Sequence, residues 1–158
     1  MGVKRVDVTG KVEKMLAGVR AAGLKLTPQR MAIVREIASD PTHPTAQELF
    51  ERLRPALPTM SFATVYNTLD ALAAAGLCAS LSLSPGPARF DPNMTPHHHA
   101  VCDRCGLVRD VVSVEDDPAP VTTGADPTRY PAGFRIRSVE LTYRGLCAEC
   151  APSQPARI

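Results

Sequence analysis

The stretch Ser61-Phe-Ala-Thr-Val-Tyr-Asn-Thr-Leu-Asp-Ala-Leu-Ala-Ala-Ala-Gly76 decides the fold of the first half of the chain. Ser61 is a favourable N-cap and Gly76 a favourable stop, so the sequence predicts a helix over residues 62–75. Apolar side chains recur at helical spacing and predict a buried stripe made of Phe62, Val65, Leu69, Leu72 and Ala73. The polar side chains expected on the other faces are Thr64, Asn67, Thr68 and Asp70. Taken alone, this polar face is explained as well by solvation as by a binding partner.

The segments on either side of this helix complete a winged helix-turn-helix. After it, alternation over residues 77–83, the turn Ser84-Pro-Gly-Pro87 and the return through Phe90 predict a two-stranded wing. Before it, helical spacing predicts a helix over 10–22, and Thr27 caps a second one over 28–39. The capping box Thr45-x-x-Glu48 starts a third helix, which Pro55 and Pro58 end. In a winged helix, the last helix enters the DNA major groove.

Charge is distributed unevenly along the chain. The net charge is only +2, yet residues 1–35 carry eight Lys or Arg against Asp7 and Glu13, a net +6. Residues 89–158 carry eight basic and nine acidic side chains. We therefore expect a polyanion-binding domain over 1–88, a hinge at about 85–91 and a metal-binding domain over 89–158. The charged N-terminus does not resemble a signal peptide, and no apolar run reaches the roughly 20 residues of a membrane span, which predicts a cytoplasmic protein.

Four of the five cysteines stand in two CxxC pairs, Cys102-x-x-Cys105 and Cys147-x-x-Cys150. Two such pairs supply the four soft ligands of a closed, tetrahedral structural zinc site. Two disulfides are the alternative, but a reducing cytoplasm favours zinc. Cys78 lies among apolar residues and is expected to be a buried small side chain.

A run of three histidines, residues 97–99, lies just before the first CxxC pair. A closed zinc shell has no place for them, so imidazoles next to it indicate a second, less rigid metal centre. His98 is expected to point to the opposite face of an extended segment from His97 and His99, and we predict that it is not a ligand.

Several short blocks carry a family resemblance when taken together. They are Leu26-Thr-Pro-Gln-Arg30, His43-Pro-Thr-Ala46, Ala63-Thr-Val-Tyr66 with Leu69, Gly76-Leu77, Arg89-Phe-Asp91, His97-x-His99 with Cys102-x-x-Cys-Gly106, and Tyr143-x-Gly-x-Cys-x-x-Cys150. In this order, over roughly residues 24–110 and 133–150, they resemble the ferric uptake regulator family. The resemblance implies an α+β protein that is not an enzyme: a cytoplasmic, dimeric, metal-dependent transcription regulator. Its N-terminal winged helix-turn-helix would precede a small α/β dimerisation domain with a structural zinc site.

Site residues follow from the resemblance by position. It assigns the structural Zn(2+) to Cys102, Cys105, Cys147 and Cys150. It assigns a regulatory metal to His43, Asp91, His97, His99 and Asp110. Imidazole and carboxylate ligands suit Fe(2+), Mn(2+) or Zn(2+), whereas the absence of a thiolate disfavours Cu(I). The residues predicted to contact a palindromic, AT-rich DNA operator are Lys25, Ser61, Thr64, Tyr66 and Asn67.

Two residues resemble the peroxide-sensing PerR branch of this family. Asp110 stands where iron-sensing members commonly have Glu, and Asn67 where many iron and zinc regulators have Arg. A further metal site of many iron regulators lacks its ligands, because Pro96 and Val139 occupy those places. With Fe(2+), the branch implies that peroxide oxidises His43 or His97 and releases metal and DNA. Iron, manganese or zinc sensing without peroxide chemistry is the alternative within the family.

The chain departs from the family pattern in one segment, and two functions outside the family are alternatives. Residues 114–134, where the family usually has an amphipathic helix, are rich in Pro and Gly and favour a loop or short irregular helix. Residues 134–143 then predict a dimer strand. A mononuclear iron enzyme would use similar ligands, but five protein ligands leave little room for substrate. A thiol redox protein would use the CxxC pairs, whose reactivity would not depend on removing metal.

Overall fold

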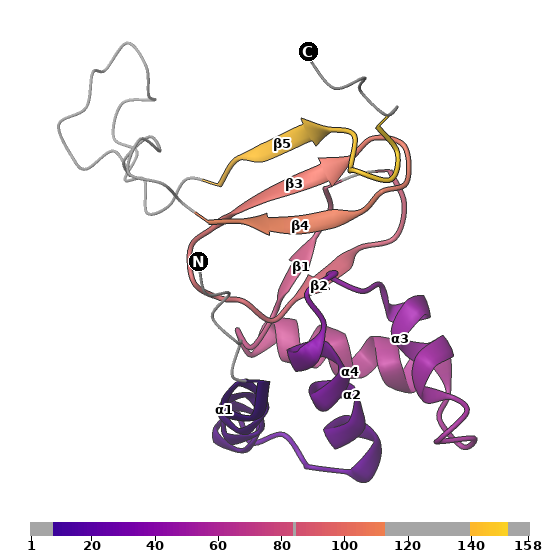
Figure 1. The fold of residues 1–158 in the computed structure, drawn as a ribbon. Helices are drawn as coiled ribbons and strands as arrows, with labels where there is room; N and C mark the ends of the chain where they lie inside the picture. The colour runs from indigo at the N-terminus through magenta and orange to yellow at the C-terminus, as the bar shows by residue number, and fades with distance from the viewer. Residues whose placement is uncertain (1–7, 84, 113–139, 152–158) are drawn as a thin grey trace, which may run out of the picture. The chain divides into compact units, whose positions relative to one another are not determined.

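The computed structural model describes residues 8–83, 85–112 and 140–151 of the 158-residue chain, which form four helices and five strands (Figure 1). The chain divides into two compact units, residues 1–94 and 95–158. The sequence placed residues 89–91 at the start of the second domain, whereas here they belong to the first unit.

The first unit begins with three helices, the second and third of which start at a capping residue. They are α1 (Val8–Ala21), α2 (Pro28–Ser39) and α3 (Ala46–Leu53). The Thr27 hydroxyl accepts a hydrogen bond from the Arg30 N–H at 3.2 Å, with Pro28 in the first turn. Thr45 and Glu48 form the predicted capping box, with reciprocal hydrogen bonds of 3.1 and 2.8 Å. Each cap satisfies amide groups that the helix cannot pair, so the predicted starts of α2 and α3 are confirmed.

The fourth helix, α4 (Phe62–Ala74), begins and ends where the sequence predicts to within one residue. The Ser61 hydroxyl accepts from the Thr64 N–H at 3.1 Å. At the other end Gly76 has φ of 68°, and the Leu77 N–H reaches back to the Leu72 carbonyl at 2.9 Å. Only glycine adopts that left-handed conformation at little cost, which explains why the helix stops there.

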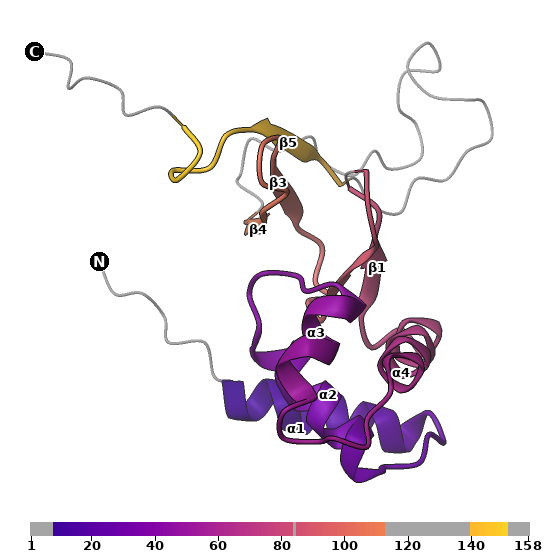
Figure 2. The ribbon, with the colours of Figure 1, turned by 90° about the vertical axis from the view of Figure 1, so that its right-hand side faces the viewer.

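The core of the first unit is aliphatic and lies between the four helices. Its fully buried side chains include Ile33, Ile37, Leu49, Leu69 and Leu72, and each contributes roughly 1.5–3 kcal/mol by leaving water. Helix α2 contacts α1, α3 and α4, and the two views place it beside α1 and α3 (Figures 1 and 2). This packing presents α4 as the last helix of a helix-turn-helix.

Two residues of α4 were assigned to the wrong environment by the sequence. Phe62, predicted in the buried stripe, is 43% exposed, because it stands in the first turn, where its ring meets Phe50 edge to face at 6.0 Å. Thr68, predicted on a polar face, is only 4% exposed. It shares a stripe with Val65 and Leu72 at helical spacing, so its position on the helix, and not its polarity, determines its burial.

The wing follows α4 as predicted. Strand β1 (Ala79–Leu81) pairs antiparallel with β2 (Arg89–Asp91). Phe90 is 5% exposed and joins the helical core, so its neighbours Arg89 and Asp91 lie on the opposite face of β2. Cys78, just before β1, is 2% exposed, and burial raises the pKa of its thiol to about 12. Its predicted role as a small buried side chain is confirmed.

The described part of the second unit is a three-stranded sheet in the order β4-β3-β5. Strand β3 (His98–Cys102) pairs antiparallel with β4 (Val108–Val111) and parallel with β5 (Thr142–Gly145). The segment 114–134, the start of the predicted dimer strand at 134–139 and Val139 lie outside the described residues.

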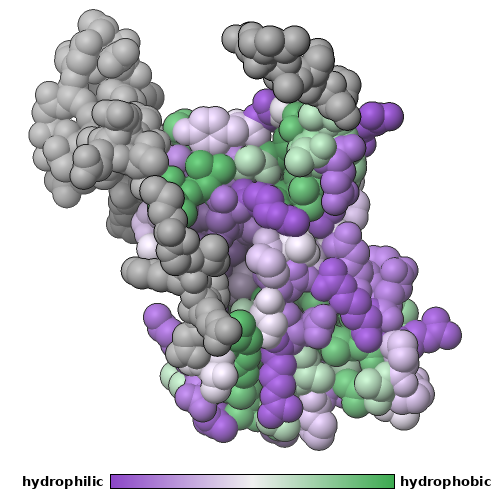
Figure 3. Space-filling view, viewed as in Figure 1, coloured by the Kyte–Doolittle hydropathy of each residue, from purple (hydrophilic) through white to green (hydrophobic). Residues whose placement is uncertain are grey.

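Apolar side chains remain exposed on this second unit. Val112, Tyr143 and Leu146 are 79%, 45% and 52% exposed, and hydrophobic surface is visible over the sheet in the space-filling view (Figure 3). Exposed apolar surface of this kind often marks a protein interface. Among the described helices, none has the length and apolar character that crossing a bilayer requires.

Candidate functional site

The two CxxC pairs meet at one end of the three-stranded sheet. Cys102 ends β3, and Cys147 follows β5 in a turn, so the parallel pairing of these strands brings the two pairs together. One ligand atom from each of Cys102, Cys105, Cys147 and Cys150 lies within 4.8 Å of the others. The Cys105 and Cys147 sulfurs are 3.7 Å apart, too far for a disulfide. Four Zn–S bonds of about 2.3 Å in a tetrahedron place sulfurs about 3.8 Å apart, so this donor set fits zinc.

Backbone geometry around the first pair supports the same reading. Gly106 has φ of 71° and donates its N–H to the Cys102 carbonyl at 2.9 Å, which folds the chain back after Cys105. The Cys147 N–H donates to the Cys102 sulfur at 3.4 Å. This and the Cys105 N–H lower the pKa of the Cys102 thiol to about 6, whereas hydrogen bonds with Cys105 and Cys147 raise that of Cys150 to about 12. The close sulfurs therefore resist losing all their protons together, and binding a cation would replace the protons that remain.

A second donor set lies on one face of the β3–β4 ladder. His99 is paired directly with Asp110, and His97 lies two residues before His99, so all three side chains are on the same face. The Nε2 atoms of His97 and His99 are 3.0 Å apart, and His97 Nε2 lies 3.4 Å from Asp110 Oδ1. His97 Nδ1 is 2.7 Å from the Thr95 carbonyl; because a carbonyl oxygen can only accept, Nδ1 carries the proton, and Nε2 is the nitrogen that could bind a metal.

His98 has a different environment from its two neighbours. It is 4% exposed, and its Nδ1 accepts the Leu141 N–H at 3.3 Å. Its ring also lies 6.2 Å from that of Tyr143 on β5. One ring nitrogen thus makes a contact on the β3–β5 side of the sheet, and that His98 is not a ligand stays a prediction.

A third set of donors lies in the first unit. His43, in the loop between α2 and α3, is 2% exposed, and Asp91 at the end of β2 is 1% exposed. His43 Nε2 and Asp91 Oδ2 are 3.6 Å apart, beyond a hydrogen bond but within the separation of two ligands on one ion. The other carboxylate oxygen of Asp91 accepts the Asn93 N–H at 2.7 Å, which fixes Oδ2 toward the imidazole.

The backbone at His43 is unusual. Its φ is 54°, in the left-handed region, at a cost of about 1–2 kcal/mol for a residue with a side chain. Strain of this kind persists where surrounding contacts hold it, and it concentrates at functional sites. Arg89 donates to the His43 carbonyl at 2.9 Å, and Glu48 in turn contacts Arg89. Neither residue was predicted from the sequence as part of the site. The capping box and the Arg89-Phe-Asp91 block were the available signals.

The predicted DNA-contacting residues lie at the start of α4 and before α2. Tyr66 and Asn67 are exposed on α4, Tyr66 by 52%. The Ser61 hydroxyl, which caps α4, lies 2.9 Å from the Thr64 hydroxyl. Lys25 is exposed in the loop before α2, where its carbonyl accepts from the Arg30 guanidinium. These positions leave the Tyr66 and Asn67 side chains open to a ligand.

Known proteins resemble this chain over most of its length. A protein described as "Peroxide-responsive repressor PerR" from Staphylococcus aureus is 38% identical over 150 residues, which cover 95% of this chain and 98% of that protein. A solved structure of the ferric uptake regulator from Pseudomonas aeruginosa with manganese matches with a TM-score of 0.64 and 26% identity, over 85% of this chain and 98% of that one.

A second solved structure, described as the structural basis for peroxide sensing and gene regulation by PerR from Streptococcus pyogenes, has a TM-score of 0.50 and 27% identity. It covers 89% of this chain and 93% of that chain. Residues 21–142 match the model of the ferric uptake regulator family, which spans both units and includes the donors at positions 43, 91, 97, 99 and 110. The chain therefore belongs to the ferric uptake regulator family, whose members are metal-responsive transcriptional regulators.

Proposed function

We propose that this protein is a metal-dependent, dimeric repressor that senses hydrogen peroxide through oxidation of a histidine ligand. The observation that carries the proposal is the pair of incomplete donor sets, one in each unit. His43 and Asp91 supply two donors from the first unit, and His97, His99 and Asp110 supply three from the second. Neither set fills the coordination shell of Fe(2+) or Mn(2+), so one ion taking both would join the units.

The chemistry of the donors favours this kind of ion. Three imidazoles and two carboxylates are intermediate in softness and suit Fe(2+) or Mn(2+). The four cysteines would hold Zn(2+) separately, as a structural element that stabilises the second unit. Because free thiolates persist in a reducing compartment, the proposal places the protein in the cytoplasm.

The histidines would serve both as metal ligands and as the residues that become oxidised. A bound Fe(2+) supplies the electrons that cleave the O–O bond of peroxide and generate an oxidant at the site. His97 and His43 present Nε2 toward the donors around them, so the ring carbons next to Nε2 would be the atoms most exposed to such an oxidant. An oxidised imidazole is a poorer ligand, and its loss would release the ion and uncouple the two units. Mn(2+) does not readily reduce peroxide and would leave the rings intact.

DNA recognition is assigned to α4 in the major groove of a double-stranded operator. Tyr66 and Asn67 would contact bases, while Lys25 and the α4 N-terminus, with Ser61 and Thr64, would hold phosphates. A homodimer binding two half-sites predicts a palindromic operator, which we expect to be AT-rich. The exposed apolar side chains of the second unit support a dimer interface there.

Titration of DNA binding with Mn(2+) tests the regulatory half of this proposal. His97→Ala is expected to abolish metal-dependent binding while the zinc content stays at one ion per chain. His98→Gln is a neighbouring control that should retain metal-dependent binding, because His98 uses its Nδ1 for the Leu141 N–H. Metal-dependent binding that survives in His97→Ala would exclude this ligand set.

A metal sensor without peroxide chemistry is the second candidate. The similarity to a ferric uptake regulator solved with manganese favours it. Such a protein would share the metal dependence and the dimer, but the Fe(2+) form would keep its DNA when peroxide is added.

A further inference from the structure

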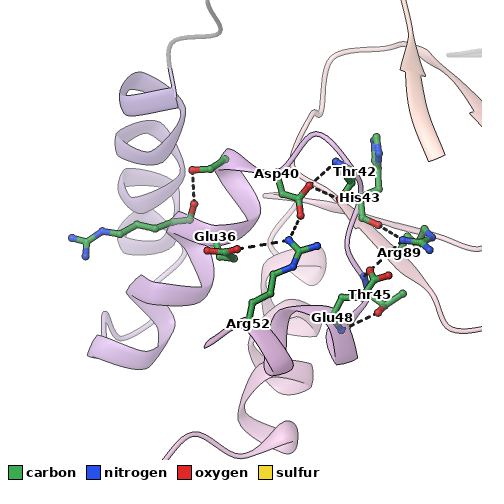
Figure 4. A network of polar contacts seen from close by, with 10 residues as sticks. Glu36, Asp40, Thr42, His43, Thr45, Glu48, Arg52 and Arg89 are labelled. Atoms are coloured by element: carbon green, nitrogen blue, oxygen red, sulfur yellow. Dashed lines mark hydrogen bonds and ion pairs between the residues drawn. The ribbon is translucent and has the colours of Figure 1, made fainter. Parts of the chain in front are cut away.

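We propose that Arg89 is a positioning residue that fixes the separation of His43 and Asp91, and with it the geometry of the regulatory metal site. The inference rests on the proposed function, because it takes both residues as ligands. Figure 4 shows the Arg89 side chain between the His43 carbonyl and the Glu48 carboxylate. Arg89 itself offers no ligand atom, so its effect would pass through the residues that it holds.

Arg89 makes two contacts with the loop that carries His43. Its Nη1 donates to the His43 carbonyl oxygen at 2.9 Å and lies 3.2 Å from Glu48 Oε2. The Arg89 side chain is only 20% exposed, which limits competition from water for these contacts. The acceptor at His43 belongs to the residue with positive φ, so the guanidinium stabilises the peptide whose conformation is strained.

Glu48 ties Arg89 to the start of α3. The same Oε2 atom also accepts the Thr45 N–H at 2.8 Å, so one carboxylate oxygen closes the capping box and anchors the guanidinium. Backbone contacts support the arrangement: Thr45 forms a bridge with Arg89, and the Phe90 N–H donates to the Pro44 carbonyl at 3.0 Å. Residues 43–45 are therefore fastened to β2 at three successive points.

Successive side chains of β2 alternate between the two faces of the strand. Phe90 enters the core, and Arg89 and Asp91 lie on the opposite face. One strand thus carries the Asp91 ligand directly and holds the His43 ligand through Arg89. A rotation of the His43 peptide would move its Nε2 away from Asp91 Oδ2, now 3.6 Å distant. An ion pair between Arg89 and Glu48 that only added stability would not require the contact to the His43 carbonyl.

The test compares four variants of the full-length, zinc-loaded protein. Arg89→Gln removes the charge and the forked donor. Glu48→Gln keeps an amide oxygen that can still accept from Thr45 and Arg89, so it weakens the anchor while the capping box remains. Arg54→Gln is the matched control, since Arg54 is an exposed arginine at the end of α3. His43→Ala marks the loss of a ligand. Mn(2+) affinity, the ligand-field spectrum of the Co(2+) form and thermal unfolding are measured for each.

Loss of an outer contact to a ligand typically lowers metal affinity by about 10- to 100-fold. We expect a loss of that size for Arg89→Gln, with a shifted Co(2+) spectrum, and a smaller loss for Glu48→Gln. Arg54→Gln should bind Mn(2+) as the parent does. In the metal-free form, amide exchange at Thr45 and Phe90 should be faster in Arg89→Gln than in the control.

The outcomes separate this inference from the proposed function. If His43→Ala loses Mn(2+) affinity while Arg89→Gln keeps it, the positioning role is wrong and the site assignment stands. Weaker binding by Arg89→Gln with an unchanged Co(2+) spectrum at saturation also overturns the positioning role. If His43→Ala binds Mn(2+) normally, the ligand set itself is wrong. Should Arg89→Gln fail to fold, Glu48→Gln decides by the same criteria.

Discussion

Asp110 shows how the role of one residue follows from its register. It lies opposite His99 in the β3–β4 ladder and 3.4 Å from His97 Nε2, and its side chain is 38% exposed. A carboxylate at this place has little to contribute to packing, whereas next to two imidazoles it can complete a cation site. The four cysteines proposed to bind zinc, by contrast, join the end of β3 to the turn after β5.

Replacing Asp110 with Ala should weaken Mn(2+) binding and metal-dependent DNA binding, because a charged donor is lost from the regulatory set. Zinc content and thermal unfolding should stay unchanged. Asp103→Asn is a suitable control, since Asp103 is an exposed carboxylate of the same unit that pairs with Arg144. Loss of zinc from the Asp110→Ala variant would mean that the two metal sites are not separable.

Asn67 is expected to read base edges, and Lys25 to contact phosphates. Asn67→Arg should change which operator is preferred, by roughly 1–3 kcal/mol per discriminated base pair. Lys25→Gln should instead weaken binding to all sequences alike and reduce the salt dependence by about one charge. Binding isotherms on a panel of related operators at several salt concentrations distinguish the two effects. An unchanged preference in Asn67→Arg would remove this residue from base readout.

Asp40 predicts a pH dependence of stability. Burial raises the pKa of this carboxyl, but hydrogen bonds from Thr42 and Arg52 outweigh that effect and hold the pKa below its ordinary value. The stabilisation is thus present above the unfolded pKa of about 3.9 and is lost as the pH falls through the lower pKa of the folded state. Asp40→Asn should lower the free energy of unfolding by about 1 kcal/mol at pH 7, a modest loss because Arg52 is partly exposed. The variant's free energy of unfolding should also depend less on pH between these two pKa values. Urea unfolding from pH 2 to 7 measures this, and parallel curves for parent and variant would contradict it.

At the scale of elements, caps and turns were the most predictable features. Thr27, Thr45, Ser61 and Gly76 act locally, through hydrogen bonds or a backbone conformation within a few residues, so the sequence determines them directly. The predicted environments of Phe62 and Thr68 were wrong, because burial at these positions depends on where α4 meets the rest of the core. The hydrophobicity of a side chain alone does not encode that contact. The positive φ of His43 and the contacts of Arg89 were missed for a similar reason: they join segments 46 residues apart.

The zinc cluster should control the sheet of the second unit. Cys147→Ser is expected to lose zinc and unfold this unit, because structural zinc contributes roughly 10–16 kcal/mol of apparent binding energy in small domains. Cys78→Ser serves as the comparison, since this cysteine belongs to the other unit's core and its loss should leave zinc bound. Metal analysis together with size-exclusion chromatography tests the prediction. A stable, zinc-free dimer of Cys147→Ser would show that the cluster is not structural.

At the scale of the whole molecule, the two units have complementary properties. The first carries the α4 helix and the donors His43 and Asp91, and the second carries the cluster of four cysteines, three further donors and exposed apolar surface. Charge follows the same division, with a net +6 over residues 1–35. Under the proposed function one regulatory ion would take donors from both units, which would account for donors on each side of residue 94.

The most direct test of this account exposes the protein to a low concentration of peroxide while it is bound to operator DNA. The Fe(2+)-loaded protein should release DNA within a brief exposure, and mass spectrometry should find one added oxygen on the peptides that carry His43 or His97. The Mn(2+)-loaded protein should retain both its DNA and unmodified histidines. An Fe(2+) form that keeps its DNA and its histidines intact would contradict peroxide sensing and leave a regulator that responds to metal alone.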